Sequence, residues 1–222
     1  MQFSIYALLN ELAAHGHAAT YKDVKRSILI LRRASLTITD SKTGKTWEEN
    51  FFPQMAIGGW EGAAGAEYQQ HYVSFHFLVS ESIQTLQYRD VNYRDLMMIK
   101  GSLARYIFQR MASVYIYASS DDPYSPSRNQ LLTESGRGTE GVGTRLSEQV
   151  SRALNQLVTQ GIIERWSVKR REKTGRAVTN LFYEIFPTKR FISDIINANK
   201  SHTHRMKKLG QKRIAQIKGS IA

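Results

Sequence analysis

The chain has 222 residues, of which 41% are hydrophobic and 23% charged, a composition typical of a globular protein with a buried core. It has no cysteine, which excludes disulfides, thiolate nucleophiles and cysteine-ligated zinc, and no apolar run approaches the roughly 20 residues of a membrane helix. The net charge of +12 is concentrated in the second half of the chain. Residues 1–120 hold 12 Lys and Arg against 10 Asp and Glu, whereas residues 121–222 hold 19 Lys and Arg against 9 Asp and Glu. This asymmetry favours a polyanionic partner.

The first half predicts two short helices, three strands and a long helix. In chain order we expect helices over 5–14 and 21–33, strands over 35–40, 46–57 and 71–77, and a helix over 92–117. Thr20 and Asp23 are placed to form a capping box at the start of the second helix. The stretch 118–128 is rich in Ser, Asp and Pro, so we interpret it as a linker between two domains.

The second half predicts a similar order of elements. We expect helices over 128–135 and 144–160 and strands over 162–170 and 177–186. At an offset of 126 residues, Val24 and Ile28 align with Val150 and Leu154. Helix, helix, strand, cationic turn and strand is the order of a winged helix. We therefore expect an α+β protein with two winged-helix domains in tandem, forming a pseudo-repeat. The expected parts are domain 1–120, domain 121–199 and a basic tail 200–222.

The helix over 144–160 has an apolar face and a polar face. Its apolar face carries Leu146, Val150, Ala153, Leu154 and Leu157. The polar face carries Arg145, Glu148, Ser151, Arg152 and Asn155. Because Arg can pair with guanine and Asn with adenine, we predict base contacts for Arg145, Arg152 and Asn155, supported by Ser151 and Glu148. The alternative is that this polar face is exposed to solvent and contacts no DNA.

Basic residues at the hairpin turns and in the tail are candidates for contact with a DNA backbone. They are Lys169, Arg170, Arg171, Lys173 and Arg176 in the second hairpin, Lys42 and Lys45 in the first, and Lys207 and Lys208 in the tail. Such contacts position a protein on DNA without reading its sequence. For the second hairpin the alternative is a solvated turn. For the tail, which predicts a basic amphipathic helix, the alternative is a membrane surface.

The helix over 21–33 is apolar nearly all round. In the alignment at an offset of 126 residues, Leu29 and Ile30 correspond to Asn155 and Gln156 of the helix over 144–160. We therefore expect Leu29 and Ile30 to be buried against the other domain or in a dimer interface.

Several motifs suggest catalysis or metal binding but lack the context that the chemistry needs. The stretch 136–143 has the spacing G-x-G-x-x-G without a preceding strand, and 39–46 lacks the first glycine of a phosphate-binding loop. The two H-x-H pairs, at 15–17 and 202–204, have no evident carboxylate partners. We therefore expect no catalytic activity, no metal and no cofactor.

Four stretches together resemble a known family. They are "VKRSILILRRASLTITD", "YVSFHFLVSESIQTLQYRDVNYRDL", "SLARYIFQRMASVYIYA" and "LSEQVSRALNQLVTQGIIERWSVKRREKTGRAVTNLFYEIF". In order and pattern the chain resembles the iteron-binding plasmid replication initiators, the tandem winged-helix Rep family. The resemblance implies an N-terminal domain for dimerisation and backbone contact and a C-terminal domain that reads origin repeats. It also implies monomers that open the origin with host replication proteins, and dimers that repress their own gene.

The sequence thus predicts a non-enzymatic, DNA-binding replication initiator. We expect it in the bacterial cytoplasm, at the nucleoid or plasmid, with double-stranded DNA, a second copy of itself and host replication proteins as partners and no membrane. A tandem winged-helix transcriptional repressor would make the same contacts at a different DNA site. A protein that binds nucleic acid non-specifically, or a membrane surface, would depend on the tail instead.

Overall fold

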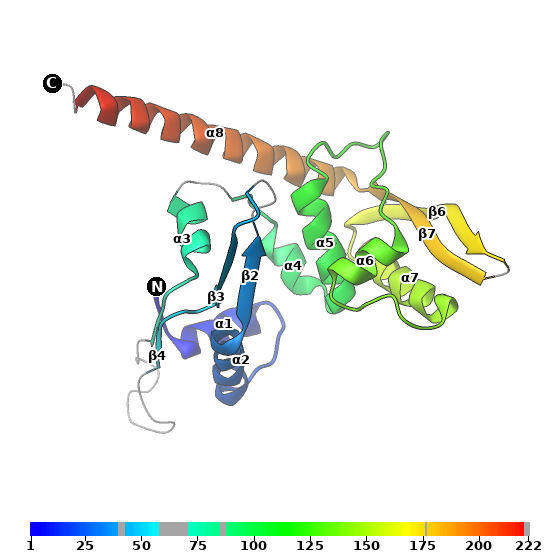
Figure 1. Cartoon of the computed structure of the whole chain (residues 1–222), viewed down its shortest axis with the longest axis horizontal. Coiled ribbons are helices and arrows are strands. Elements are labelled where there is room, and N and C mark those ends of the chain that lie inside the picture. Colours follow the sequence, from blue (N-terminus) through cyan, green and yellow to red (C-terminus); the bar gives the residue numbers. More distant parts are fainter. Residues whose placement is uncertain (40–42, 58–70, 85–87, 176, 220–222) are drawn as a thin grey trace. The chain divides into compact units, whose positions relative to one another are not determined.

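The chain is an α+β protein that divides into two compact units, Met1–Gln87 and Tyr88–Ala222 (Figure 1). The computed structural model describes residues 1–39, 43–57, 71–84, 88–175 and 177–219. Unit 1 contains 7 of the 31 Lys and Arg and 8 of the 19 Asp and Glu, which leaves 24 and 11 for unit 2. The whole positive excess of the chain therefore belongs to unit 2.

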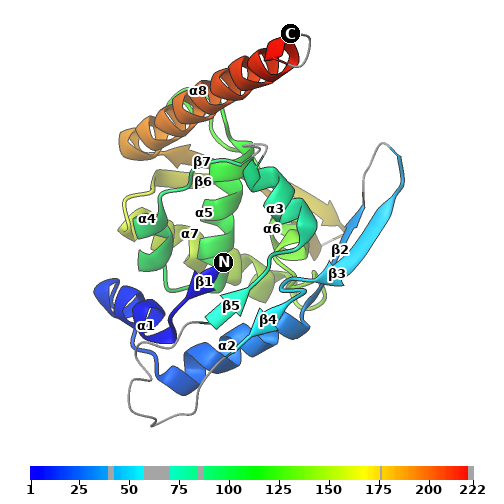
Figure 2. The ribbon, with the colours of Figure 1, turned by 90° about the vertical axis from the view of Figure 1, so that its left-hand side faces the viewer.

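In its described residues, unit 1 combines three helices with two small sheets. Its elements are β1 (Gln2–Phe3), α1 (Ile5–Ala14), α2 (Tyr21–Arg33), β2 (Ser35–Thr39), β3 (Thr46–Asn50), β4 (Met55–Ala56), β5 (His71–Val73) and α3 (Phe77–Gln84). β2 and β3 form an antiparallel hairpin, and β1, β5 and β4 lie side by side (Figure 2). The buried core consists of Ile5, Val24, Ile28, Phe52 and Val73.

The two helices predicted at the start of the chain are confirmed with the same bounds. The capping box is also present, because the Asp23 N–H donates to Thr20 Oγ1 at 3.2 Å and the Thr20 N–H donates to Asp23 Oδ2 at 3.0 Å. The expected strand over 71–77 is wrong beyond Val73, since Phe77 begins α3. There the Leu78 N–H donates to His76 Nδ1 at 3.1 Å, which turns the chain out of the sheet. The predicted strand 46–57 is likewise interrupted after Asn50.

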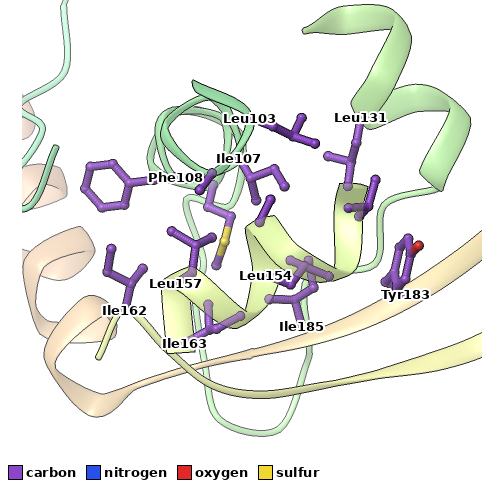
Figure 3. Close-up of a cluster of buried hydrophobic side chains, with 14 of the residues drawn as sticks. Leu103, Ile107, Phe108, Leu131, Leu154, Leu157, Ile162, Ile163, Tyr183 and Ile185 are labelled. Carbon is purple, nitrogen blue, oxygen red and sulfur yellow. The ribbon is translucent and has the colours of Figure 1, made fainter. Parts of the chain in front are cut away.

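In the residues that the structure describes, unit 2 combines five helices with one long hairpin. Its elements are α4 (Tyr93–Met98), α5 (Ser102–Val114), α6 (Arg128–Glu134), α7 (Gly143–Thr159), β6 (Ile163–Thr174), β7 (Ala177–Pro187) and α8 (Lys189–Gly219). Side chains from α5, α6, α7 and the hairpin point toward one another in the core (Figure 3). Completely buried members include Ile107, Leu131, Leu154, Leu157, Ile163 and Ile185. The core thus fixes α7 between α5 and the hairpin.

The division between the units lies at residues 87 and 88, earlier than the boundary expected from the stretch 118–128. That stretch belongs to unit 2, where the Tyr124 N–H donates to the Ile185 carbonyl at 3.0 Å and the Tyr183 N–H donates to the Pro126 carbonyl at 3.0 Å. It therefore runs along the edge of β7, a position that tolerates proline. α5 belongs to unit 2 as well, because Ile107 lies in its core. α8 is continuous through residue 200, so the expected tail does not begin at a break.

The long helix expected over 92–117 is interrupted between α4 and α5. Gly101 caps the start of α5, and its N–H donates to Gln156 Oε1 of α7 at 3.1 Å. A Cβ at position 101 would lie 2.5 Å from the same oxygen. The backbone is extended at Ile99 and Gly101, with ψ of 113° and 127°, and this interrupts the helix where the periodicity alone suggested a continuous one.

The first turns of α8 pack against the rest of unit 2 through apolar residues. Phe191 and Ile195 are buried, whereas Ile196 is 44% exposed. Two ion pairs attach α8 to the segment around α4, Arg190 with Asp95 at 2.7 Å and Arg205 with Asp90 at 2.8 Å. Beyond these contacts α8 extends away from the rest of unit 2 (Figure 1).

Candidate nucleic-acid interface

α7 presents a polar face to solvent. Arg145, Glu148, Arg152 and Asn155 are exposed, and Ser151 is half-buried at the edge of this face. The opposite side is buried, and it consists of Leu146, Val150, Ala153, Leu154 and Leu157. The predicted division of the helix into two faces is therefore confirmed, while the role of the polar face is still a prediction.

The two arginines of this face differ from its asparagine in their contacts. Within the described part of the chain, Arg145 and Arg152 make no hydrogen bond or ion pair. Asn155, by contrast, accepts a hydrogen bond at Oδ1 from Trp166 Nε1 at 2.9 Å. This bond orients the Asn155 amide, and the oxygen keeps a second lone pair for another donor. Two free guanidinium groups and one oriented amide are thus available to an external partner.

The cations of the hairpin β6–β7 fall into two groups. Lys169 pairs with Glu184 at 3.3 Å, and Arg170 pairs with Glu172 at 3.0 Å. Arg171 and Lys173 are exposed, and neither has an ion-pair partner among the described residues. Arg176, the fifth predicted cation, lies outside the described residues. The sequence predicted the same role for all five cations. Of the four that the structure describes, Arg171 and Lys173 are unpaired.

A β-bulge determines which way Arg171 faces. The register shifts between Val168 and Arg170, and Arg171 then lies opposite the buried Leu181. Directly opposed residues share one face of a sheet, so Arg171 lies on the side of the hairpin that packs on α7. There it lines a hollow of about 500 Å³ with Thr144 and Ser147 from the first turns of α7. The bulge therefore places an unpaired guanidinium beside the start of the polar helix.

Arg128 is a buried residue that the sequence analysis did not single out, and it connects α7 to the hairpin. Its side chain is 2% exposed. Nη1 donates to the Gly143 carbonyl and to Ser147 Oγ, both at 3.1 Å, and Nη2 donates to the Thr179 carbonyl of β7. No acidic residue of the described chain pairs with it. The buried guanidinium therefore fixes the first turn of α7 against β7 through neutral acceptors. The sequence did contain a signal for the burial of Arg128. It precedes Leu131 and Leu132 by three and four residues, so all three lie on the apolar side of α6.

Gly143 completes this junction. A Cβ there would lie 2.9 Å from the Val178 carbonyl oxygen and 3.5 Å from Arg128 Nη1. Glycine therefore allows α7 and β7 to approach each other closely where α7 begins.

The remaining predicted contact residues belong to segments other than α7 and the hairpin β6–β7. Lys45 is exposed beside the turn between β2 and β3, while Lys42 lies outside the described residues. Lys207 and Lys208 are exposed on α8.

Leu29 and Ile30 are 38% and 58% exposed in the single chain, although α2 buries Val24 and Ile28. An interface at Leu29 and Ile30 therefore remains a prediction.

Metal-binding clusters and membrane-spanning helices are both absent from the described residues. In the part of the chain that the structure covers, no group of three or more His, Asp or Glu side chains is placed to hold a metal ion. None of the helices in these residues combines the length and the apolar character needed to cross a bilayer.

Comparison of the sequence with protein-family models and with curated proteins gives no match.

Proposed function

We propose that this protein binds double-stranded DNA sequence-specifically through α7 and the hairpin β6–β7. Within that class, we propose that it initiates plasmid replication by binding repeated origin sites. The observation that carries the first proposal is the pair of unpaired guanidinium groups, Arg145 and Arg152, on the exposed face of a helix whose other face is core. The concentration of positive charge in unit 2 supports a polyanionic ligand.

Each unit is proposed to be a winged helix, which makes the protein a tandem of two. In unit 2 the supporting order is α5, an edge segment at 124–127, α6, α7 and the hairpin β6–β7. In unit 1 the corresponding order is α1, α2 and the hairpin β2–β3. In winged-helix proteins the second helix of the helix-turn-helix enters the major groove.

In the proposed mechanism α7 lies in the major groove, which at about 12 Å admits one helix. Arg145 and Arg152 donate to guanine, and the oriented amide of Asn155 contacts a neighbouring base. Arg171 and Lys173 hold a phosphate strand beside the start of α7, and Lys207 and Lys208 add further backbone contacts from α8. These contacts set affinity and register, while the face of α7 sets sequence preference.

Origin opening is proposed to follow from the binding of several copies at adjacent repeats, together with host replication proteins. The chain itself is proposed to act without catalysis or a cofactor. Self-association through the exposed Leu29 and Ile30 of α2 would give a dimer that represses the protein's own gene.

The test of DNA reading compares substitutions on the helix and on the hairpin. We expect Arg152→Ala to weaken specific binding by about 1–3 kcal/mol and to relax preference at one base pair, with little effect on random DNA. We expect Arg171→Ala to weaken both kinds of DNA and to lower the salt slope by about 0.9. Arg170→Ala is the matched control, because Arg170 is paired with Glu172 and should contribute less. Equal losses on specific and random DNA for both helix and hairpin variants would contradict a reading helix.

A further inference from the structure

A second hollow lies beside α7, on the side away from the hairpin. Its volume is about 270 Å³, below the roughly 300–1,000 Å³ of pockets that enclose drug-sized ligands. The start of α5, the loop before α7 and α7 itself contribute to its walls. The polar residues that matter here are Ser102, Arg137, Gln149, Arg152 and Gln156.

The two hollows lie along opposite edges of the polar face of α7. Gln149, Arg152 and Gln156 follow one another at spacings of three and four, so they line one edge of the helix. Thr144 and Ser147, three residues apart, line the other edge beside Arg171. A helix in the major groove has a phosphate strand on each side. The hairpin would hold one strand, and the second hollow is placed for the other.

We infer that the hollow between α5 and α7 binds a backbone phosphate of DNA, with Arg137 as its principal ligand. This inference rests on the proposed function and adds a contact to it. Arg137 is exposed, and its Nη2 donates to Ser102 Oγ at 2.6 Å, which holds the guanidinium against another residue that lines the hollow. A guanidinium has five N–H donors, so this bond leaves others for a ligand.

The charge of the hollow suits an anion. Arg137 and Arg152 both line it, and among the residues that the structure describes no carboxylate does. A comparable hollow around α4 also contains two arginines, Arg94 and Arg190, but there Arg190 is paired with Asp95. The hollow at Arg137 therefore has uncompensated positive charge and room for a group as small as a phosphate.

The experiment measures binding of the full chain to its duplex site while single phosphates are replaced by neutral methylphosphonates. In the wild type, neutralising the phosphate that occupies the hollow should weaken binding. Arg137→Ala should weaken binding to specific and random DNA about eightfold at 0.1 M salt, which is the loss of one phosphate contact with a slope of about 0.9. In this variant the same methylphosphonate should have no further effect. Arg137→Lys should retain the salt slope, and Arg94→Ala, an equal change of charge at an exposed position, should bind like the wild type.

The outcomes separate this inference from the proposed function. If the wild type binds duplex DNA and every methylphosphonate costs the same in Arg137→Ala as in the wild type, Arg137 holds no phosphate and the inference is overturned while the function stands. If Arg137→Ala and Arg94→Ala both bind like the wild type, the inference is overturned in the same way. Failure of the wild type to bind duplex DNA would overturn the proposed function, and this site with it. Inhibition by free inorganic phosphate at equal ionic strength, with no methylphosphonate coupled to Arg137, would identify a free anion as the ligand and also overturn the inference.

Discussion

Replacement of Arg128 by methionine tests how α7 is held against the hairpin. The side chain is buried and its guanidinium donates to Gly143, Ser147, Thr179 and Asn129, so the variant loses four hydrogen bonds from a charged donor. The two carbonyl acceptors keep a donor, because Ser147 Oγ still donates to the Gly143 carbonyl at 2.8 Å and Asn129 Nδ2 still donates to the Thr179 carbonyl at 3.2 Å.

The expected loss follows from this count. Hydrogen bonds to a charged group contribute roughly 1.5–3 kcal/mol each, but here two of the four acceptors keep other donors and the burial cost of the guanidinium is relieved. We therefore expect Arg128→Met to lower the free energy of unfolding by about 2 kcal/mol. Urea unfolding followed by far-UV circular dichroism measures it, with Arg94→Met as the exposed control.

The same variant should lose part of the contribution of the hairpin to DNA binding, because α7 and β7 are no longer fixed to each other. The salt slope should fall toward that of Arg171→Ala, and the double variant should fall no further. A variant as stable as the wild type, or fully additive effects on DNA binding, would refute the positioning role of Arg128.

Three further predictions concern single residues. Trp166→Phe removes the donor that orients Asn155, and it should reduce discrimination at one base pair by about 1 kcal/mol in competition binding; unchanged preference would contradict the role of that bond. Gly143→Ala should destabilise the protein by about 1–3 kcal/mol in urea unfolding, although alanine favours helices, because the new Cβ meets the Val178 carbonyl; a more stable variant would contradict it. Burial lowers the pKa of His71, so its neutral form stabilises the fold above pH about 6.5 and this stability is lost as the pH falls. Thermal unfolding from pH 7.5 to 5 should therefore show a smaller decline in His71→Phe than in the wild type, and equal declines would contradict the prediction.

The elements that local sequence patterns determine were predicted well. α7 has apolar residues at spacings of three and four, so its buried and exposed faces followed from periodicity alone. The helix α2 followed from the capping box of Thr20 and Asp23. The basic hairpin followed from alternating apolar residues on either side of a Gly-containing turn.

The features that the sequence did not show depend on contacts between distant residues. The stretch 118–128 has the composition of a linker, and its pairing with β7 has no local signature. The N–H of Gly101, where α5 begins after the break in the long helix, bonds to Gln156 of α7, which lies far along the chain. The charge pattern could not separate Arg170 from Arg171, because a bulge and an ion pair decide which of them is free.

Footprinting of the purified protein on DNA from around its own gene tests the central claim most directly. Binding by the face of α7 predicts protection of a defined sequence, and the proposed initiator predicts tandem direct repeats beside an AT-rich stretch. The Arg152→Ala variant should lose the protection at a protein concentration where Arg170→Ala retains it. Protection of a single promoter site would favour a repressor over an initiator, whereas uniform, sequence-independent protection would contradict the account.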